Sequence, residues 1–178
     1  MDLLDLMREK RFLGLEFLTW AWYTSEINSG LIDLEGFGSV ELWFEDRIVL
    51  ESGTGNSRQV VTCQGKDLEL AEAKTALTEG KKVCQARMRL AVEGKEWRLT
   101  VKAEGLELTS IRAPKTLDVE EDEESESLAG RLLDRVAVIE ELTRIVDVLY
   151  ARFLAVRLSG DWKEKELPRM RRWLRSVE

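Results

Sequence analysis

Residues 12–23 constrain the fold more than any other part of this chain, because five of these twelve residues are aromatic. We predict a helix over about 3–26, in which Gly14 interrupts the apolar pattern without ending it. Rings cluster in this way when a helix is buried over most of its circumference. We therefore expect Trp20, Trp22 and Tyr23 in the core rather than on a platform for a ligand.

A second strong pattern is the alternation of apolar and polar residues between 82 and 112. Trp97, Leu99 and Val101 alternate with polar residues, so one face of this strand would be buried and the other wet. Short turns that contain glycine separate the runs, which indicates an antiparallel meander. Its predicted strands are 82–92, 96–103 and 106–112.

The chain upstream of the meander also reads mainly as strands. Two β-rich runs flank Glu45 and Asp46, and we interpret them as a hairpin that turns at this acidic pair. The expected elements of this region are strands at 40–44, 47–51 and 58–64, followed by a short helix at 70–78.

A long helix is predicted over about 128–158, with Gly160 at its end. Apolar residues recur along it at alternating spacings of three and four, which is typical of a helix–helix seam. The seam consists of Ile139, Leu142, Val146, Leu149, Phe153 and Val156. Two roles fit it: packing against the chain's own sheet, or pairing with a second copy in a homodimer.

These elements predict an α+β fold, in which an antiparallel β-sheet is packed by the aromatic N-terminal helix and the long C-terminal helix. A length of 178 residues suits one domain. We assign residues 1–158 to this domain, with an acidic linker at 118–127 inside it, and residues 159–178 to a basic helical tail.

The acidic character of the chain is concentrated in one run. Seven acids fall between Asp118 and Glu126, and the formal net charge of the whole chain is −7. The remainder is therefore electrically balanced, and its total charge does not mark a nucleic-acid binder. Such a run is typical of a solvated linker. An alternative is that it mimics nucleic acid and occupies a basic groove.

The residue types present argue against most catalytic chemistry. Histidine is absent, which removes the commonest general base and metal ligand. Cys63 and Cys84 lie in strand-like runs and are expected to be buried thiols. We find no catalytic motif, so we expect no enzyme, cofactor, metal or small-molecule substrate. A nuclease would need carboxylates on rigid elements rather than in a flexible run.

The location of the protein is expected to be cytoplasmic. No apolar run approaches the roughly 18 residues of a membrane helix, so no membrane partner is expected. The first residues are acidic where a signal peptide would be basic.

Two groups of basic residues are candidates for binding phosphates. The wet face of the meander carries Arg87, Arg89, Arg98 and Lys102, and Arg112 extends this group. A basic sheet face can follow a phosphate backbone, although pairing with neighbouring acids is the plainer role. The second group lies in the tail, where Arg169, Arg171 and Arg172 accompany Trp162 and Trp173. These tryptophans could stack on bases or dock the tail onto the body.

The segment Phe-Leu-Gly-Leu-Glu-Phe-Leu-Thr-Trp-Ala-Trp-Tyr at 12–23 resembles one found in the bacterial RdgC family of recombination-associated proteins. The features after it follow the family's order. These are the strand pair at 40–50, the turn Gly80-Lys81-Lys82-Val83, the meander at 87–111, the acidic stretch and the terminal helix. The resemblance covers roughly residues 10–158 and concerns the C-terminal half of the family.

This resemblance implies a function. RdgC proteins are non-enzymatic binders of double-stranded DNA that form ring-like dimers and limit the access of the RecA recombinase. It implies that Arg87, Arg89, Arg98 and Lys102 contact phosphates without reading sequence, and that the protein associates with the nucleoid. The leading hypothesis is therefore an RdgC-like duplex-binding protein that modulates recombination, and the alternative is a dimeric protein–protein interaction module that binds no DNA. A contiguous positive strip would favour the first, and scattered ion pairs the second.

Overall fold

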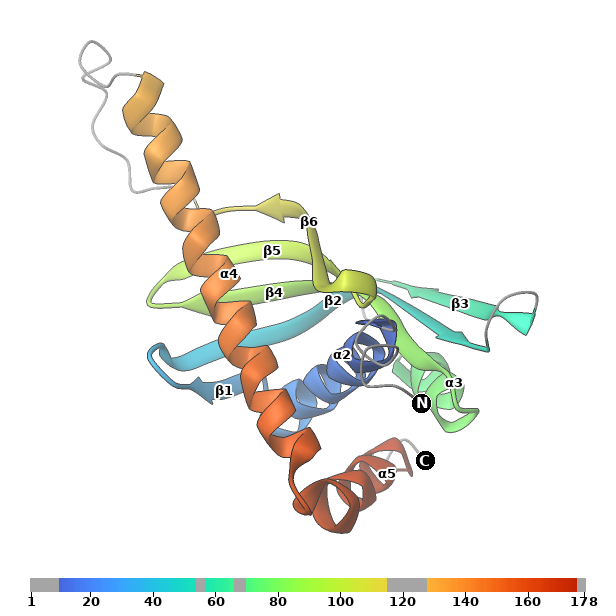
Figure 1. Cartoon of the computed structure of the whole chain (residues 1–178). Coiled ribbons are helices and arrows are strands. Elements are labelled where there is room, and N and C mark those ends of the chain that lie inside the picture. Colours follow the sequence, from blue (N-terminus) through green and yellow to red (C-terminus); the bar gives the residue numbers. More distant parts are fainter. Residues whose placement is uncertain (1–9, 54–56, 66–69, 115–127, 176–178) are drawn as a thin grey trace.

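The computed structural model describes residues 10–53, 57–65, 70–114 and 128–175. It confirms the α+β class: a six-stranded antiparallel sheet is packed by the aromatic N-terminal helix and by the long C-terminal helix (Figure 1). The acidic run at 118–126, for which a linker and a nucleic-acid mimic were both considered, lies outside the described residues.

The sheet is built around one long central strand. Its order is β1-β2-β4-β5-β6, and β3 also pairs with β2. Because β1 and β3 pair with opposite ends of β2, they occupy the same edge of that strand. The strands are β1 (Leu31–Leu34), β2 (Gly38–Ser52), β3 (Gln59–Gln64), β4 (Lys82–Val92), β5 (Lys95–Lys102) and β6 (Glu107–Arg112).

The hairpin expected around Glu45 and Asp46 is wrong. Both flanks belong to β2 and pair with β4, and the pairing register shifts between Phe44 and Ile48. The acidic pair therefore lies at an irregularity within one strand rather than at a turn between two. A bulge of this kind re-aims side chains while the strand continues.

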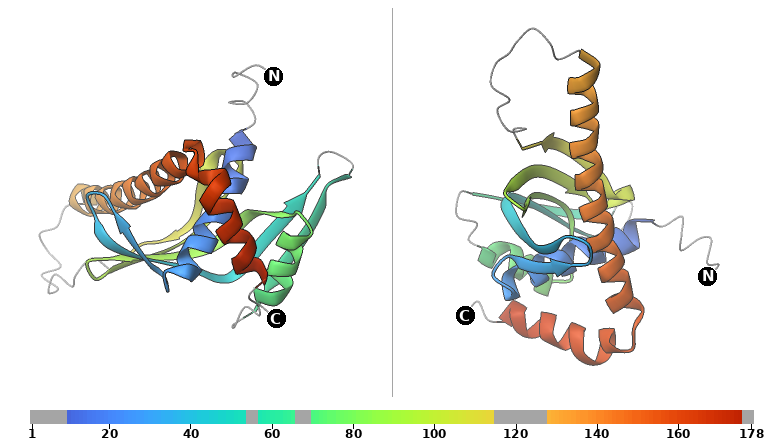
Figure 2. Two further views of the ribbon diagram at one scale, coloured as in Figure 1. Left: turned by 90° about the horizontal axis from the view of Figure 1, so that it is seen from below. Right: turned by 90° about the vertical axis from the view of Figure 1, so that its left-hand side faces the viewer.

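The helices cover one face of the sheet (Figures 1 and 2). Alternate strand residues such as Met88, Leu90 and Leu99 are buried beneath them. The opposite face of the sheet carries no described helix and holds mainly polar side chains. The helices are α2 (Lys10–Ile27), α3 (Leu70–Thr78), α4 (Leu128–Leu158) and α5 (Leu167–Arg175), and a π-helical turn, η3 (Trp162–Glu166), joins the last two.

The aromatic side chains of α2 form the centre of the core. Trp20, Trp22 and Tyr23 expose 2%, 1% and 1% of their surface, which confirms the prediction that they are core residues. Phe17 and Trp20 both contact Phe153 of α4, with ring centroids 5.7 Å and 5.6 Å apart. Edge-to-face and offset ring pairs at such separations are stabilising beyond their buried area.

The tail docks onto this core through its two tryptophans, Trp162 and Trp173, which expose 5% and 8% of their surface. The indole Nε1–H of Trp173 donates to Glu26 Oε2 at 2.6 Å. The Lys74 ammonium lies 2.8 Å from the same carboxylate oxygen and over the Trp173 ring. These contacts join α2, α3 and α5, so of the two roles considered for these tryptophans the structure shows docking of the tail.

Close packing also explains Gly14, which interrupts the apolar pattern of α2. A Cβ atom at this position would overlap the backbone carbonyl of Ala103, just before the short 3₁₀ turn η2 (Glu104–Leu106). Only glycine therefore allows α2 to approach the sheet this closely.

We expect Gly14→Ala to lower the free energy of unfolding by about 3 kcal/mol or more, because backbone cannot move aside as a flexible side chain can. Urea denaturation followed by circular dichroism measures this change. Gly160→Ala is the matched control, since a Cβ there meets nothing within 4 Å and should cost little. Equal effects of the two changes would contradict the packing described here.

Candidate functional site

The open face of the sheet gathers the predicted basic residues of the meander. Strand alternation places Arg87 and Arg89 on β4, and Arg98 and Lys102 on β5, on the side opposite the core. Their side chains are 31–50% exposed. The structure thus brings these four residues onto one surface, as the alternation indicated.

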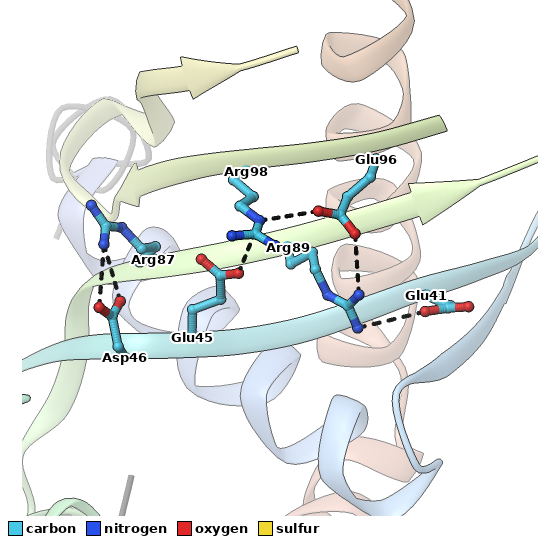
Figure 3. A network of polar contacts seen from close by, with 7 residues as sticks. All are labelled: Glu41, Glu45, Asp46, Arg87, Arg89, Glu96 and Arg98. Atoms are coloured by element: carbon cyan, nitrogen blue, oxygen red, sulfur yellow. Dashed lines mark hydrogen bonds and ion pairs between the residues drawn. The ribbon is translucent and has the colours of Figure 1, made fainter. Parts of the chain in front are cut away.

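Each of these cations is paired with an acid, and Figure 3 shows the pairs of the three arginines. Glu96 Oε2 lies 3.2 Å from Arg89, and Glu96 Oε1 lies 3.0 Å from Arg98. Both arginines also reach acids on β2. The further pairs are Arg87–Asp46 at 3.1 Å, Arg89–Glu41 at 3.7 Å, Arg98–Glu45 at 3.4 Å and Lys102–Glu107 at 3.1 Å.

Glu96 occupies the centre of this network. Burial alone would raise the pKa of its carboxyl group, but the hydrogen bonds from Arg89 and Arg98 outweigh burial and lower this pKa below its ordinary value. Hydrogen bonds to a carboxylate favour its charged form. Glu96 therefore stays ionised and neutralises charge on both arginines.

The open face is consequently a set of ion pairs and not a contiguous positive strip. The irregularity in β2 supplies Glu45 and Asp46, and these side chains partner Arg98 and Arg87. Sequence alternation placed the arginines but could not show that acids from β2, some 40 residues away, would lie beside them. By the criterion stated above, this arrangement favours an interaction module over a duplex-binding face.

The remaining basic candidates are differently placed. Arg112 is exposed at the end of β6, and Arg171 and Arg172 are exposed on α5. None of these three forms an ion pair with a residue that the structure describes. Arg169 lies 3.9 Å from Glu166. Among the predicted basic candidates, the unpaired positive charge thus lies on α5 and at Arg112.

The predicted seam on α4 is largely an internal contact. Leu142 and Phe153 expose 0% of their surface, Leu149 exposes 1% and Val146 exposes 6%, all within a single chain. The homodimer role proposed for these four positions is therefore corrected: they pack in the chain's own core. Val156 is partly buried against the same core, and only Ile139, at 44%, is exposed.

An exposed apolar surface lies further toward the start of α4. We call it the α4 stripe, and its residues are Leu132, Leu133, Val136 and Ile139, which expose 53%, 69%, 51% and 44% of their surface. This part of the helix extends beyond the sheet (Figure 1). Sequence reasoning missed the stripe, although its 132–136–139 spacing of four and three is itself typical of an apolar helix surface.

The two thiols of the chain lie in the described strands β3 and β4. Cys63 is buried and Cys84 is partly buried, and neither is in a disulfide. Burial, followed by the nearby Glu72 charge, raises the pKa of the Cys63 thiol, which disfavours the reactive thiolate. Within the described residues, no group of three or more Cys, Asp or Glu side chains could hold a metal ion.

Comparisons with known proteins leave the family open. No family model matches the chain, and no curated protein matches it. Among the helices that the structure describes, none is both long and apolar enough to cross a membrane.

The Glu96 network predicts a specific pH dependence. A carboxyl pKa that is lowered on folding contributes stability above the ordinary pKa, and this contribution is lost as the pH falls through the folded value. Glu96→Gln should therefore reduce stability at pH 7 by no more than about 1 kcal/mol, because the pairs are partly exposed. It should also flatten the loss of stability between about pH 6 and pH 3.

Urea titrations at several pH values measure both effects. Glu104→Gln is the control, because Glu104 is exposed and is not part of this network. If Glu96→Gln and the wild-type chain lose stability in parallel on acidification, the central role of Glu96 is contradicted.

Proposed function

We propose that this chain is a non-catalytic interaction protein that self-associates through the α4 stripe. The observation that supports the proposal is the exposure of four large apolar side chains on one helix surface. Contiguous exposed apolar surface on a protein that is otherwise well packed marks an interaction site. The resemblance of residues 12–23 to the RdgC family, whose members form dimers, also supports self-association.

The pattern of α4 fits a parallel pair of helices. When the helix is written as heptads, Leu132 and Ile139 take d positions and Val136 takes an a position. Arg135 then takes a g position and Glu140 the e position that follows it. In a parallel pair, Arg135 of one copy faces the partner's Glu140, so the flanking charges are complementary.

The expected association is weak. A stable protein–protein interface buries roughly 800 Å² on each partner, which exceeds what four half-exposed side chains can supply. The stripe also spans little more than one heptad, from Leu132 to Ile139, which is short for a coiled coil that would form in isolation. We therefore expect a dimer whose population rises with concentration over the micromolar range or above.

Replacing stripe residues should weaken this association. Leu132→Gln combined with Val136→Gln should raise the dimer dissociation constant by at least about tenfold, because burial of two large apolar side chains is lost. Sedimentation velocity over a concentration series measures the constant. Ala151→Gln, at an exposed position in the second half of α4, is the control and should leave the constant unchanged.

A charge swap tests the parallel register. Arg135→Glu and Glu140→Arg should each weaken the dimer, since each places like charges opposite one another, and the double variant should restore it. A wild-type chain that remains monomeric at about 1 mM contradicts the proposal. A dimer that is insensitive to both the stripe variant and the swap contradicts it equally.

As a second candidate we infer weak duplex binding through α5. The supporting observation is the set of exposed arginines on that helix, of which Arg171 and Arg172 form no ion pair with a described residue. The buried side of the helix holds Trp173, so these arginines are held facing outward. Cations arranged in this way can bind phosphates without reading sequence.

A mobility-shift assay at low salt tests this candidate. We expect binding at tens of micromolar protein or less, weakening steeply as salt rises, because non-specific affinity comes from counterion release. Arg171→Glu and Arg172→Glu should each weaken it, whereas Arg47→Glu, at an exposed position on β2, should not. Absence of any shift at this concentration removes duplex binding as a function.

A further inference from the structure

A small cavity on the open face of the sheet is surrounded by arginines from three adjacent strands. Its volume is about 190 Å³. Arg87 comes from β4, Arg98 from β5 and Arg112 from β6. Glu45, Leu99 and Ser110 complete its lining. Figure 3 shows Arg87 and Arg98 on neighbouring strands above the acids of β2.

Two of these arginines occupy opposed positions on neighbouring strands. Arg98 and Arg112 are directly paired across β5 and β6. Like charges at directly opposed positions of neighbouring strands destabilise a sheet. Arg112 has no acidic partner among the described residues, so its charge is not compensated by the protein there.

The guanidinium groups also retain donors for a ligand. Arg87 uses Nη1 to bond Asp46, and Arg98 uses Nε to contact Glu45 and Glu96. A guanidinium carries five N–H donors in a fixed fork, which suits the oxygens of a phosphate group. Arginines with remaining donors thus line the same small space as the uncompensated Arg112.

The backbone at the cavity wall is strained. Ser110 has a φ of 52°, which is uncommon for a residue with a side chain. It lies where the β5–β6 register shifts, so β6 is irregular beside the cavity. Strain of this kind costs free energy and often accompanies a binding site, where it positions a group for its ligand.

We propose that this cavity binds one phosphate group, in the form of a phosphomonoester or free phosphate. Arg112 supplies the uncompensated charge, Arg87 and Arg98 add donors, and Ser110 forms the wall. The site is separate from the α4 stripe and goes beyond self-association. If phosphate does not bind, the self-association proposal still stands, because phosphate binding and dimerisation are tested with different variants and different measurements.

The surroundings favour a single phosphate group over a nucleic-acid backbone. A backbone would need a row of unpaired cations, whereas the neighbouring Arg89 and Lys102 are paired with acids. The cavity is also smaller than the roughly 300–1,000 Å³ of sites that hold whole drug-sized ligands. A compact phosphate group fits this volume.

Isothermal titration calorimetry with inorganic phosphate and with phenyl phosphate tests the proposal. We expect saturable binding to the wild-type chain with a dissociation constant of about 1 mM or tighter. Arg112→Gln should weaken it at least about tenfold, because a charge-assisted hydrogen bond is lost. Lys163→Gln removes an exposed cation in η3, outside the cavity, and should leave binding unchanged.

Ser110→Gly is the second variant. Glycine accepts a positive φ without strain, so this chain should fold with a melting temperature no lower than that of the wild type. It should nevertheless bind phosphate more weakly, because the Ser110 side chain no longer lines the cavity and the backbone of β6 is more flexible at this position. If the Arg112→Gln chain and the Ser110→Gly chain each bind phosphate as tightly as the wild type, the proposed site is contradicted. The absence of saturable phosphate binding to the wild type contradicts it as well.

A titration with duplex DNA distinguishes a phosphomonoester from a nucleic-acid backbone as the source of the phosphate group. Short duplex DNA is titrated against the wild-type chain and Arg112→Gln under the same conditions. We expect any duplex affinity to be the same for both chains, because the proposed ligand is a monoester. If Arg112→Gln weakens duplex binding as much as phenyl phosphate binding, the cavity serves a nucleic-acid backbone and the monoester assignment is overturned.

Discussion

The packing of the α2 aromatic rings against α4 and α5 is the contact on which the rest of the structure depends. Phe153 of α4 touches both Phe17 and Trp20, while Trp173 of α5 touches Trp22 with ring centroids 5.3 Å apart. Each such ring contributes about 3–5 kcal/mol on truncation, which is comparable with the whole stability of a domain of about 5–15 kcal/mol. The helices are therefore fixed over one face of the sheet, and the other face is left to polar side chains.

This constraint divides α4 into two parts with different roles. The part around Leu142, Leu149 and Phe153 is committed to the core and cannot serve a partner without unfolding. The part around Leu132 and Val136 lies beyond the aromatic contacts, and its apolar side chains stay half exposed. A helix is stabilised mainly by packing of its apolar surface, and an exposed apolar segment outside the core is typical of an interaction site, for which we propose a second copy of the chain.

Local sequence patterns predicted most of the helices and strands. They failed where residues distant in the sequence determine a turn, an ion pair or the burial of a helix surface. Alternation in Trp97, Leu99 and Val101 and the rings at 12–23 were sufficient for the sheet face and the buried helix. Glu45 and Asp46 resembled a turn, because their partners Arg98 and Arg87 lie on other strands and are not visible locally. The four-and-three spacing on α4 was correct, but spacing alone does not show which half is covered by the sheet. The cavity for which we propose phosphate binding likewise depends on a pairing of β5 with β6 that brings Arg98 opposite Arg112.

Amide hydrogen exchange along α4 at low and high protein concentration tests this division most directly. We predict that amides around Leu142–Phe153 are protected at every concentration, because they belong to the single-chain core. Amides around Leu132–Ile139 should exchange faster in dilute solution and gain protection as the concentration rises. Equal protection of both parts in dilute solution, or no change of the first part with concentration, would contradict the account.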